Sequence, residues 1–317
     1  MQVNNNIGSE LPLVTIVTPS YNQAEFLEAC ISSVLMQDYP RIEYIVLNDG
    51  STDHTATILE KYRERIRYEN QSNMGQASTL NKGWSLASGS ILGYLSSDDI
   101  LHPWAVRLAV NELSNHPETV MVYPNCDLID PNSRIIKKSV SKPTDYIALV
   151  RDQECHVGPG AFFRKETFNI VGGWNSDLKL APDREFWMRM GLHGKFRMIP
   201  EVCAQYRMHP KSISYYATDL KAASEYIQVT QQFFNRSDIP SELFNQKDIA
   251  FSKAHVVAAR IHLRGGRILN CLEEIKSAYQ CDPKLNIAAL IIMLIRTSIS
   301  RSVYRVIWNL RQIFSKK

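Results

Sequence analysis

Two adjacent carboxylates, Asp98 and Asp99, are the residues whose types and spacing point most directly to chemistry. Two serines precede them, and before the serines lies the apolar run Ile91–Leu95, which is typical of a short buried strand. Burying one unpaired carboxylate is costly, and burying two side by side costs more. Their oxygens suit Mg²⁺ or Mn²⁺, and such an ion often carries a phosphate. The pair therefore predicts a metal and phosphate site, although acids that cap a turn or a helix start would give the same pattern.

Two earlier apolar runs, residues 13–17 and 42–47, also end in polar residues. These are Thr18-Pro19-Ser20-Tyr21-Asn22 after the first run and Asn48-Asp49-Gly50-Ser51 after the second. Segments with helical periodicity separate the runs, at about residues 22–35, 53–64, 75–87 and 103–115. This alternation predicts an α/β protein with a mostly parallel sheet flanked by helices. Because ligands of open α/β sheets bind at the carboxyl ends of strands, we expect the three polar clusters to line one crevice.

Two local signals mark the end of the first strand and the start of the first helix. Pro19 has no N–H to donate to a ladder, so we expect the strand to stop before it. Asn22 and Glu25 resemble a capping box that opens the helix.

Composition excludes several classes of protein. The chain has 317 residues, of which 44% are apolar and 21% charged, as in ordinary globular proteins. Its net charge of +4 is too small to indicate nucleic acid, and it has no zinc-finger spacing. The six cysteines form no CxxC pair and indicate reduced thiols in a reducing compartment. Residues 1–10 lack the apolar core of a signal peptide, which favours a cytoplasmic protein.

Helical periodicity dominates from about residue 215 onward, after a mixed pattern between residues 133 and 209. Residues 255–283 resemble one helix-turn-helix unit of the tetratricopeptide kind, with Gly265 and Gly266 at the turn. We therefore expect a ligand-binding and catalytic α/β domain at 1–214 and a helical C-terminal extension at 215–317.

Seven short motifs, in order along residues 13–214, resemble the inverting glycosyltransferases of family 2, which have the GT-A fold. They are Thr18-Pro19-Ser20-Tyr21-Asn22, Asn48-Asp49-Gly50-Ser51-Thr52-Asp53, Gly75-Gln76-Ala77 with Asn81-Lys82-Gly83, Ser96-Ser97-Asp98-Asp99, Val171-Gly172-Gly173-Trp174, Asp183-Arg184-Glu185-Phe186-Trp187 and Tyr206-Arg207-Met208-His209-Pro210-Lys211-Ser212. The resemblance implies transfer of a hexosyl or N-acetylhexosaminyl group from a UDP- or dTDP-sugar, with inversion. The implied acceptor is a hydroxyl of a growing glycan, a lipid-linked molecule or a protein, as in polysaccharide biosynthesis.

The resemblance also assigns donor contacts. The nucleotide-sugar would be bound by Pro19, Ser20, Tyr21, Asn22, Asp49, Gly75, Gln76 and Asp98. Tyr21 offers a ring for a base to stack on, and Asp49 can accept from an imino N–H of a uracil-like base. The structural alternatives are a packed loop aromatic at Tyr21, an Asx-turn at Asp49 and a plain helix N-terminus at Gly75.

The metal site implied by the resemblance holds Mn²⁺ or Mg²⁺. Asp99 would bind the ion directly, Asp98 would face the ribose or the ion, and His209 would be the third contributor. Phosphate oxygens would be held by Arg207, Lys211 and Ser212. A single histidine is usually not a ligand, so His209 depends on this context.

Asp183 is the candidate general base, because inverting transfer needs one carboxylate to take the acceptor hydroxyl's proton. Its alternative role is a helix N-cap. Pro182 stands where the family has the first acid of a Glu-Asp pair, which is a departure. Gly173 and Trp174 would form the turn beneath the acceptor, with Trp174 either a sugar platform or a core residue.

Residues 285–317 carry no acidic side chain and alternate basic with apolar residues. This basic amphipathic pattern allows contact with an anionic membrane surface, at the inner face of the cytoplasmic membrane. A helix packed on the catalytic domain with a solvated basic face is the alternative. Two rival functions also remain, a sugar nucleotidyltransferase and a catalytically degenerate protein that binds nucleotide-sugars or acts as a scaffold subunit.

Overall fold

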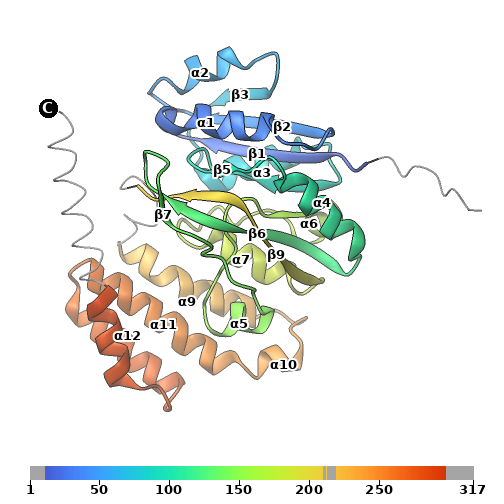
Figure 1. Ribbon diagram of the computed structural model, residues 1–317. Helices are drawn as coiled ribbons and strands as arrows, with labels where there is room; N and C mark the ends of the chain where they lie inside the picture. The colour runs from blue at the N-terminus through green and yellow to red at the C-terminus, as the bar shows by residue number, and fades with distance from the viewer. Residues whose placement is uncertain (1–10, 210–211, 213–218, 298–317) are drawn as a thin grey trace, which may run out of the picture. The chain divides into compact units, whose positions relative to one another are not determined.

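The structure, a computed structural model, describes residues 11–209, 212 and 219–297 (Figure 1). The chain divides into two compact units. The first runs to Pro143 and also contains His156–Trp174 and His193–Arg207. The second contains Thr144–Cys155, Asn175–Leu192 and the described residues after Arg207.

All strands of the described residues belong to one sheet in the first unit. Its order is β3-β2-β1-β4-β8-β6-β9-β5, with β7 paired to β6. The strands are β1 Val14–Ser20, β2 Ile42–Asp49, β3 Arg67–Gln71, β4 Ile91–Tyr94, β5 Ile100–Leu101, β6 Thr119–Ile129, β7 Ile135–Lys137, β8 Phe162–Arg164 and β9 Lys195–Arg207. The strands β3, β2, β1 and β4 are parallel, whereas β8 lies antiparallel between β4 and β6. The mixed sheet confirms the predicted α/β class.

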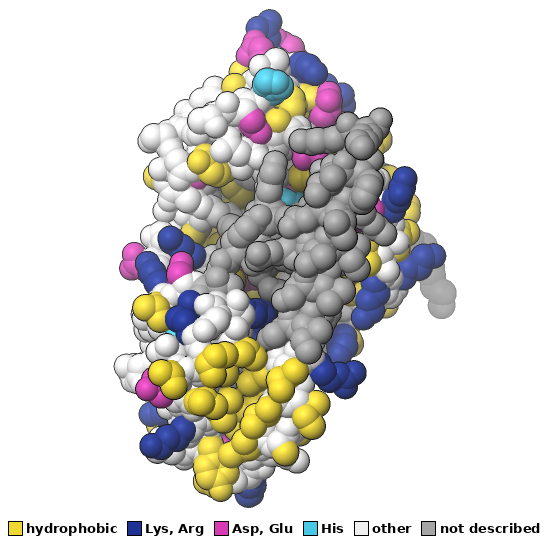
Figure 2. All heavy atoms as spheres, turned by 90° about the vertical axis from the view of Figure 1, so that its left-hand side faces the viewer, with side chains coloured by type: hydrophobic (Ala, Val, Ile, Leu, Met, Phe, Trp, Pro, Cys, Tyr) yellow, Lys and Arg dark blue, Asp and Glu magenta, His cyan; other side chains and the backbone are white. Residues whose placement is uncertain are grey.

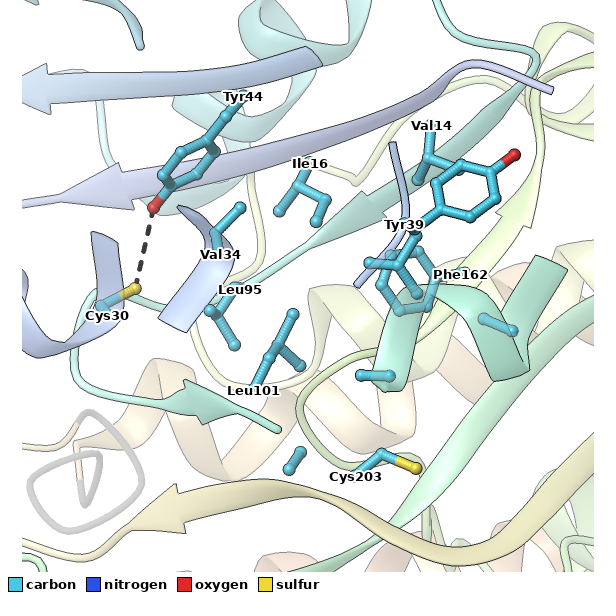
Figure 3. Packing of buried hydrophobic residues seen from close by; sticks show 14 of the residues in the cluster. Val14, Ile16, Cys30, Val34, Tyr39, Tyr44, Leu95, Leu101, Phe162 and Cys203 are labelled. Atoms are coloured by element: carbon cyan, nitrogen blue, oxygen red, sulfur yellow. Dashed lines mark hydrogen bonds between the residues drawn. The ribbon is translucent and has the colours of Figure 1, made fainter. Parts of the chain in front are cut away.

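Helices of the first unit cover both faces of the sheet (Figure 1). They are α1 Ala24–Leu35, α2 Thr55–Lys61, α3 Gln76–Ser85, α4 Ala105–Asn115 and α6 Lys165–Val171. One face buries Val14, Ile16 and Tyr44 against α1 and α4, as Figure 3 shows in part. The other face carries α3, where a Cβ on Gly83 would lie 2.3 Å from Val17. Alternate residues of β1 thus serve opposite cores.

The second unit is helical in its described residues. Its helices are α5 Tyr146–Arg151, α7 Pro182–Met190, α9 Leu220–Phe234, α10 Ser241–Phe244, α11 Lys247–Arg264, α12 Ile268–Cys281 and a helical segment at 287–297. The hairpin of α11 and α12 turns at Gly265 and Gly266, where the helix-turn-helix unit was expected. Fully buried Ala258, Ala259 and Ala278 allow its helices to approach closely.

Two local predictions are wrong, and so is the alternative of a helix start at Asp99. Pro19 lies inside β1, opposite Leu47 of β2. It is tolerated because β4 pairs with β1 only as far as Val17, so no ladder on that side needs its N–H. The N-cap of α1 is Gln23, without a side-chain hydrogen bond, rather than Asn22. The residues after Asp99 form the short strand β5 before α4 begins.

An apolar surface lies on the second unit, over α12 and residues 287–297 (Figure 2). Its exposed side chains are Ile268, Leu269, Leu272, Ile287, Ile291, Ile292 and Ile295. The opposite side of 287–297 packs Leu290 and Leu294 against Cys271 and Ile275 of α12. Among the described helices, none is both long enough and apolar enough to cross a membrane.

Candidate active site

Hydrogen bonds tie together the loops that follow β1 and β2. The Asn22 amide donates to Ser51 Oγ at 3.0 Å, and Asn22 Oδ1 accepts from the Thr52 amide at 2.8 Å. Asp53 accepts from the Ala24 amide at 2.9 Å, and so it satisfies the N-terminus of α1. Asn22 has φ 54°, a left-handed conformation that asparagine tolerates. Asn22 therefore fixes the loop after β1 to the loop after β2.

The first loop exposes its aromatic ring. Tyr21 is 49% exposed, which removes the alternative of a packed loop aromatic and leaves a ring face available. Ser20 is buried at the strand end, and its Oγ has no hydrogen-bond partner in the structure. A buried hydroxyl without a partner is costly, so a ligand atom that reached it would gain a bond the protein does not supply.

Asp49, at the end of β2, is buried and organises the loop before α3. Its Oδ1 accepts from Gln71 Nε2 and from the Met74 amide, both at 2.9 Å. Its Oδ2 accepts from the Gly75 amide at 2.9 Å. Each carboxylate oxygen has about two acceptor sites, so Oδ2 retains one. Gly75 has φ 84°, a conformation that favours glycine, and it leads into α3 at Gln76.

The acidic pair lies beyond the end of β4, on the same edge of the sheet as the loops after β1 and β2. Asp99 is 3% exposed, and its Oδ1 accepts from the Arg207 amide at 2.8 Å. Burial, and secondly the charge of Asp98, raise the pKa of Asp99 well above its usual value. The parallel half of the sheet thus brings all three predicted polar clusters to one edge.

Arg207 uses its side chain to hold this region together. Its Nε donates to the Asp98 carbonyl at 2.7 Å. Its Nη1 lies within 3.1 Å of the carbonyls of Asp130 and Pro131 and of Ser133 Oγ. The guanidinium is buried, and its carbon lies 4.8 Å from the ring centre of Phe26. Arg207 therefore supports the backbone of the acidic pair, rather than reaching for phosphate with these atoms.

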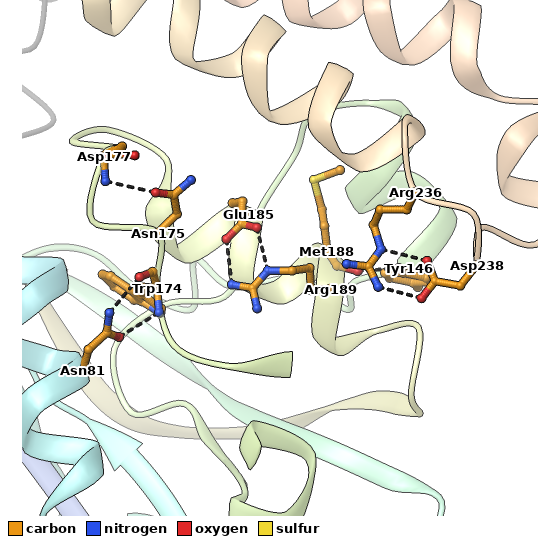
Figure 4. Close-up of polar contacts among 10 residues, drawn as sticks. All are labelled: Asn81, Tyr146, Trp174, Asn175, Asp177, Glu185, Met188, Arg189, Arg236 and Asp238. Carbon is orange, nitrogen blue, oxygen red and sulfur yellow. Dashed lines mark hydrogen bonds and ion pairs between the residues drawn. The ribbon is translucent and has the colours of Figure 1, made fainter. Parts of the chain in front are cut away.

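The turn at Gly173 and Trp174 is fixed by Asn81, a residue of the third motif to which the sequence assigned no role (Figure 4). Asn81 Nδ2 donates to the Trp174 carbonyl and Oδ1 accepts from its amide, both at 2.8 Å. A Cβ on Gly173 would lie 2.2 Å from that Oδ1, so the position requires glycine. The Trp174 ring is 5% exposed and packs edge-on against Trp84 and Tyr94. The sugar-platform role is therefore wrong, and the core alternative holds.

Asp183 lies in the second unit, as the second residue of α7. The N-cap of this helix is Ala181, so Asp183 is not the cap that the alternative proposed. Burial raises the pKa of Asp183, and hydrogen bonding to the Arg184 amide partly opposes that rise. A carboxylate with a raised pKa is a better proton acceptor, as a general base requires.

A shallow hollow lies between α7 and α9 in the same unit (Figure 4). Glu185 and Arg189 line it and form a two-point ion pair with 2.6 and 2.8 Å contacts. Arg236, also in its wall, is paired with Asp238 at 2.6 Å. Because two residues along a helix correspond to about 200° of rotation, Glu185 points away from the Asp183 side of α7. The hollow is therefore separate from the candidate base.

The remaining predicted ligands lie near residue 209. His209, in the second unit, is buried, and its carbonyl accepts from the Ser212 amide at 3.0 Å. Lys211 lies outside the described residues. In the part of the chain that the structure describes, no three His, Cys, Asp or Glu side chains form a group suited to a metal ion. Asp98 and Asp99 nevertheless fit a hard divalent cation, because they are adjacent oxygen donors and burial disfavours the charge of Asp99, which Arg207 offsets only in part.

The other reactive side chains are structural. Cys30 hydrogen-bonds with Tyr44 in the core (Figure 3), and burial raises the pKa of its thiol to about 12. Burial likewise raises the pKa of Cys203 to about 12. Thiols of this kind are unreactive at neutral pH.

Comparison with solved structures shows the GT-A fold. S. aureus TarS 1-349 in complex with UDP-GlcNAc superposes with a TM-score of 0.63 at 16% identity, over 84% of this chain and 92% of that chain. The mannosyltransferase PcManGT from Pyrobaculum calidifontis, in complex with GDP-Man and Mn2+, gives 0.61 at 19% identity, over 98% and 89%.

In sequence the chain is similar to glycosyltransferases. The model for glycosyl transferase family 2 matches residues 15–169. It is 30% identical over 197 residues to chondroitin synthase of Escherichia coli, covering 61% of this chain and 28% of that protein. An uncharacterised glycosyltransferase of Rickettsia prowazekii is 32% identical over 185 residues, with 56% and 58% covered. The chain thus spans less than two thirds of either relative.

Proposed function

We propose that the protein is an inverting, metal-dependent glycosyltransferase that moves a sugar from a UDP- or dTDP-sugar to a hydroxyl group. The observation that carries this proposal is the edge of the parallel sheet in the first unit. There the exposed Tyr21, the loop held by Asp49 and the acidic pair follow three neighbouring strands, within or beside the residues matched by the family model.

In this proposal the base stacks on Tyr21, and the free acceptor site of Asp49 Oδ2 receives an N–H of the base. Pro19, Ser20, Asn22, Gly75 and Gln76 complete the pocket. Asp98, Lys211 and Ser212 contact the ribose and the phosphates. Arg207 supports the backbone of Asp98 through its hydrogen bond to the Asp98 carbonyl. A Mg²⁺ or Mn²⁺ ion held by Asp98, Asp99 and His209 would neutralise charge on the departing diphosphate. The Mn2+ in the PcManGT complex supports such an ion.

Asp183 is proposed to remove the proton from the acceptor hydroxyl. The acceptor oxygen then forms a bond to the anomeric carbon while the bond from that carbon to the diphosphate oxygen breaks. The electron pair of the broken bond leaves with the nucleoside diphosphate, and the proton stays on Asp183. One displacement inverts the anomeric centre, so no carboxylate nucleophile is required.

The acceptor is proposed to be a growing glycan, either free, lipid-linked or attached to a protein. Relatives named as synthases of chondroitin and hyaluronan support a polysaccharide product. We assign nucleotide-sugar binding and catalysis to residues 1–214, and a supporting role to the helices of 215–317. A sugar nucleotidyltransferase is disfavoured by the family match, and a degenerate binding subunit is favoured only by Pro182 in place of an acid.

Residues 285–317 are proposed to contact the inner face of the cytoplasmic membrane. Their described part presents Ile291, Ile292 and Ile295 to solvent, and the sequence carries no acid after Asp282. Flotation with phosphatidylglycerol vesicles tests this, using the intact chain, a chain ending at residue 284 and the double variant I291S/I295S. Equal flotation of all three would eliminate the membrane contact, and a loss confined to the two altered chains would support it.

The transferase itself is tested by a thermal-shift screen of UDP, dTDP and GDP sugars with Mn²⁺, followed by transfer assays with the donor that binds. Binding to the folded state raises the melting temperature by mass action, so the true donor gives the largest shift. Release of pyrophosphate instead of a nucleoside diphosphate would indicate a nucleotidyltransferase. Donor binding without transfer or donor hydrolysis would indicate a degenerate subunit.

A further inference from the structure

A fully buried carboxylate on α9 holds the loop that leads into α7. Glu225 is 0% exposed, and its two oxygens accept three successive backbone N–H groups. The donors are Lys179 at 2.9 Å, Leu180 at 2.6 Å and Ala181 at 3.3 Å. The next residue, Pro182, has no N–H and begins the helix. Glu225 therefore satisfies the last three amides before the candidate base Asp183.

A carboxylate at this position is a costly way to gain stability. Removing an ionised carboxylate from water costs several kcal/mol, about what three charge-assisted bonds return. An apolar side chain could fill the same space without that cost, but the loop amides would lose their acceptors. The arrangement fixes the path of residues 179–181 more than it stabilises the fold.

Tyr226, the next residue of α9, packs against Arg184, the residue that follows Asp183. The guanidinium carbon of Arg184 lies 5.5 Å from the ring centre of Tyr226. Arg184 Nη2 also donates to the Leu149 carbonyl of α5 at 3.1 Å. Asp183 thus lies between a loop held by Glu225 and an arginine packed on Tyr226. Adjacent residues of one helix fix the backbone on both sides of the candidate base.

We propose that Glu225 is a positioning residue for the transfer reaction, which sets the orientation of Asp183 through the loop 179–181. The inference rests on the proposed role of Asp183 as the general base. It places a residue needed for catalysis in the C-terminal helical extension, beyond the stretch 15–169 that the family model matches. The extension is then part of the catalytic apparatus, in addition to any role in attachment.

The experiment replaces Glu225 by Gln and uses Thr230→Val as the matched control. In E225Q one loop amide faces the new NH₂ group and loses its acceptor. Thr230 lies on the same helix, is also 0% exposed, and bonds the Tyr226 carbonyl at 2.8 Å, but it does not bond residues 179–181. Each variant changes one buried polar group of α9, and only E225Q changes a group that bonds the loop. Three quantities are measured for each: kcat and KM, nucleoside diphosphate affinity, and hydrogen exchange at 179–185.

We expect E225Q to lower kcat about 10- to 100-fold, because small displacements of a catalytic group have effects of that size. Donor affinity stays within about twofold, and the amides of 179–181 exchange faster. T230V keeps kcat within about threefold. Unchanged kcat in E225Q, or an equal loss in T230V, would overturn the positioning role while the transferase stands. If the wild-type chain transfers no sugar, the proposed function fails, and the positioning role fails with it.

Discussion

The loop before α3 in the first unit and the loop before α7 in the second unit are held by the same kind of hydrogen bonding. In each, a buried carboxylate accepts the amides of a loop that opens a helix, Asp49 from Met74 and Gly75, and Glu225 from Lys179 to Ala181. Asp49 retains an acceptor site for a ligand, whereas Glu225 is enclosed. The difference indicates that the carboxylate of Asp49 has capacity for a ligand in addition to its loop contacts, whereas that of Glu225 contacts the loop.

Substitution of Asp183 in the second unit is expected to lower the transfer rate and to leave donor binding unchanged. Asp183→Asn removes the proposed base and lowers the transfer rate about 10²- to 10⁴-fold, because general-base catalysis contributes that much. Donor affinity is unchanged, since α7 carries no proposed donor contact. Steady-state kinetics and calorimetry measure both quantities. The exposed Asp177 of the preceding loop supplies a control, and D177N is expected to keep full activity; loss of donor binding in D183N would show a structural role.

Substitution of Asp49 tests whether its carboxylate acts on donor binding, in contrast to the effect of Glu225 on the transfer rate. Asp49→Asn turns one acceptor oxygen into a donor that faces loop amides, which costs about 1–3 kcal/mol in a buried site. We expect donor KM to rise about 10-fold or more with a smaller change in kcat, the reverse of E225Q. Asp38→Asn, at an exposed ion pair with Arg107, is the control. A purely kcat effect in D49N would remove the distinction between the two anchors.

The pH dependence of transfer, compared between the wild type and D183N, reports on Asp183 of the second unit. Because burial raises the pKa of Asp183, transfer should fall with decreasing pH at values above those usual for aspartate. The raised pKa also means that folding favours the protonated carboxyl, so its contribution to stability is present at low pH and lost as pH rises through the folded pKa. Rate and melting profiles measure both. An acid limb that persists in the residual activity of D183N would assign it to another group.

The smallest expected effect concerns the exposed ring of the first region. Tyr21→Ala should weaken nucleoside diphosphate binding about fivefold, near the 1 kcal/mol typical of aromatic stacking, and Tyr21→Phe should change it less than twofold. Fluorescence titration is sufficient to measure this. Equal affinities for the wild type and Y21A would leave the base without a stacking partner at this edge.

The sequence predicted what depends on local pattern. Alternating apolar runs and helical periodicity gave the parallel half of the sheet and the common edge of its polar clusters. Features that depend on contacts between residues distant in the sequence could not be predicted. Pro19 remains in β1 because the neighbouring strand ends early, and Trp174 is buried because Trp84 and Tyr94 lie beside it. Glu225 lies more than forty residues from the loop it holds, so no spacing rule connects the two.

The central claim is that Asp98 and Asp99 hold a divalent cation together with a nucleoside diphosphate. Calorimetric titration of UDP, dTDP and GDP, with Mn²⁺ and again with a chelator, tests it on the wild-type chain and on Asp99→Ala. The account predicts binding of one nucleotide that requires Mn²⁺ and disappears in D99A. Equal binding with the chelator, or unchanged binding in D99A, would contradict it.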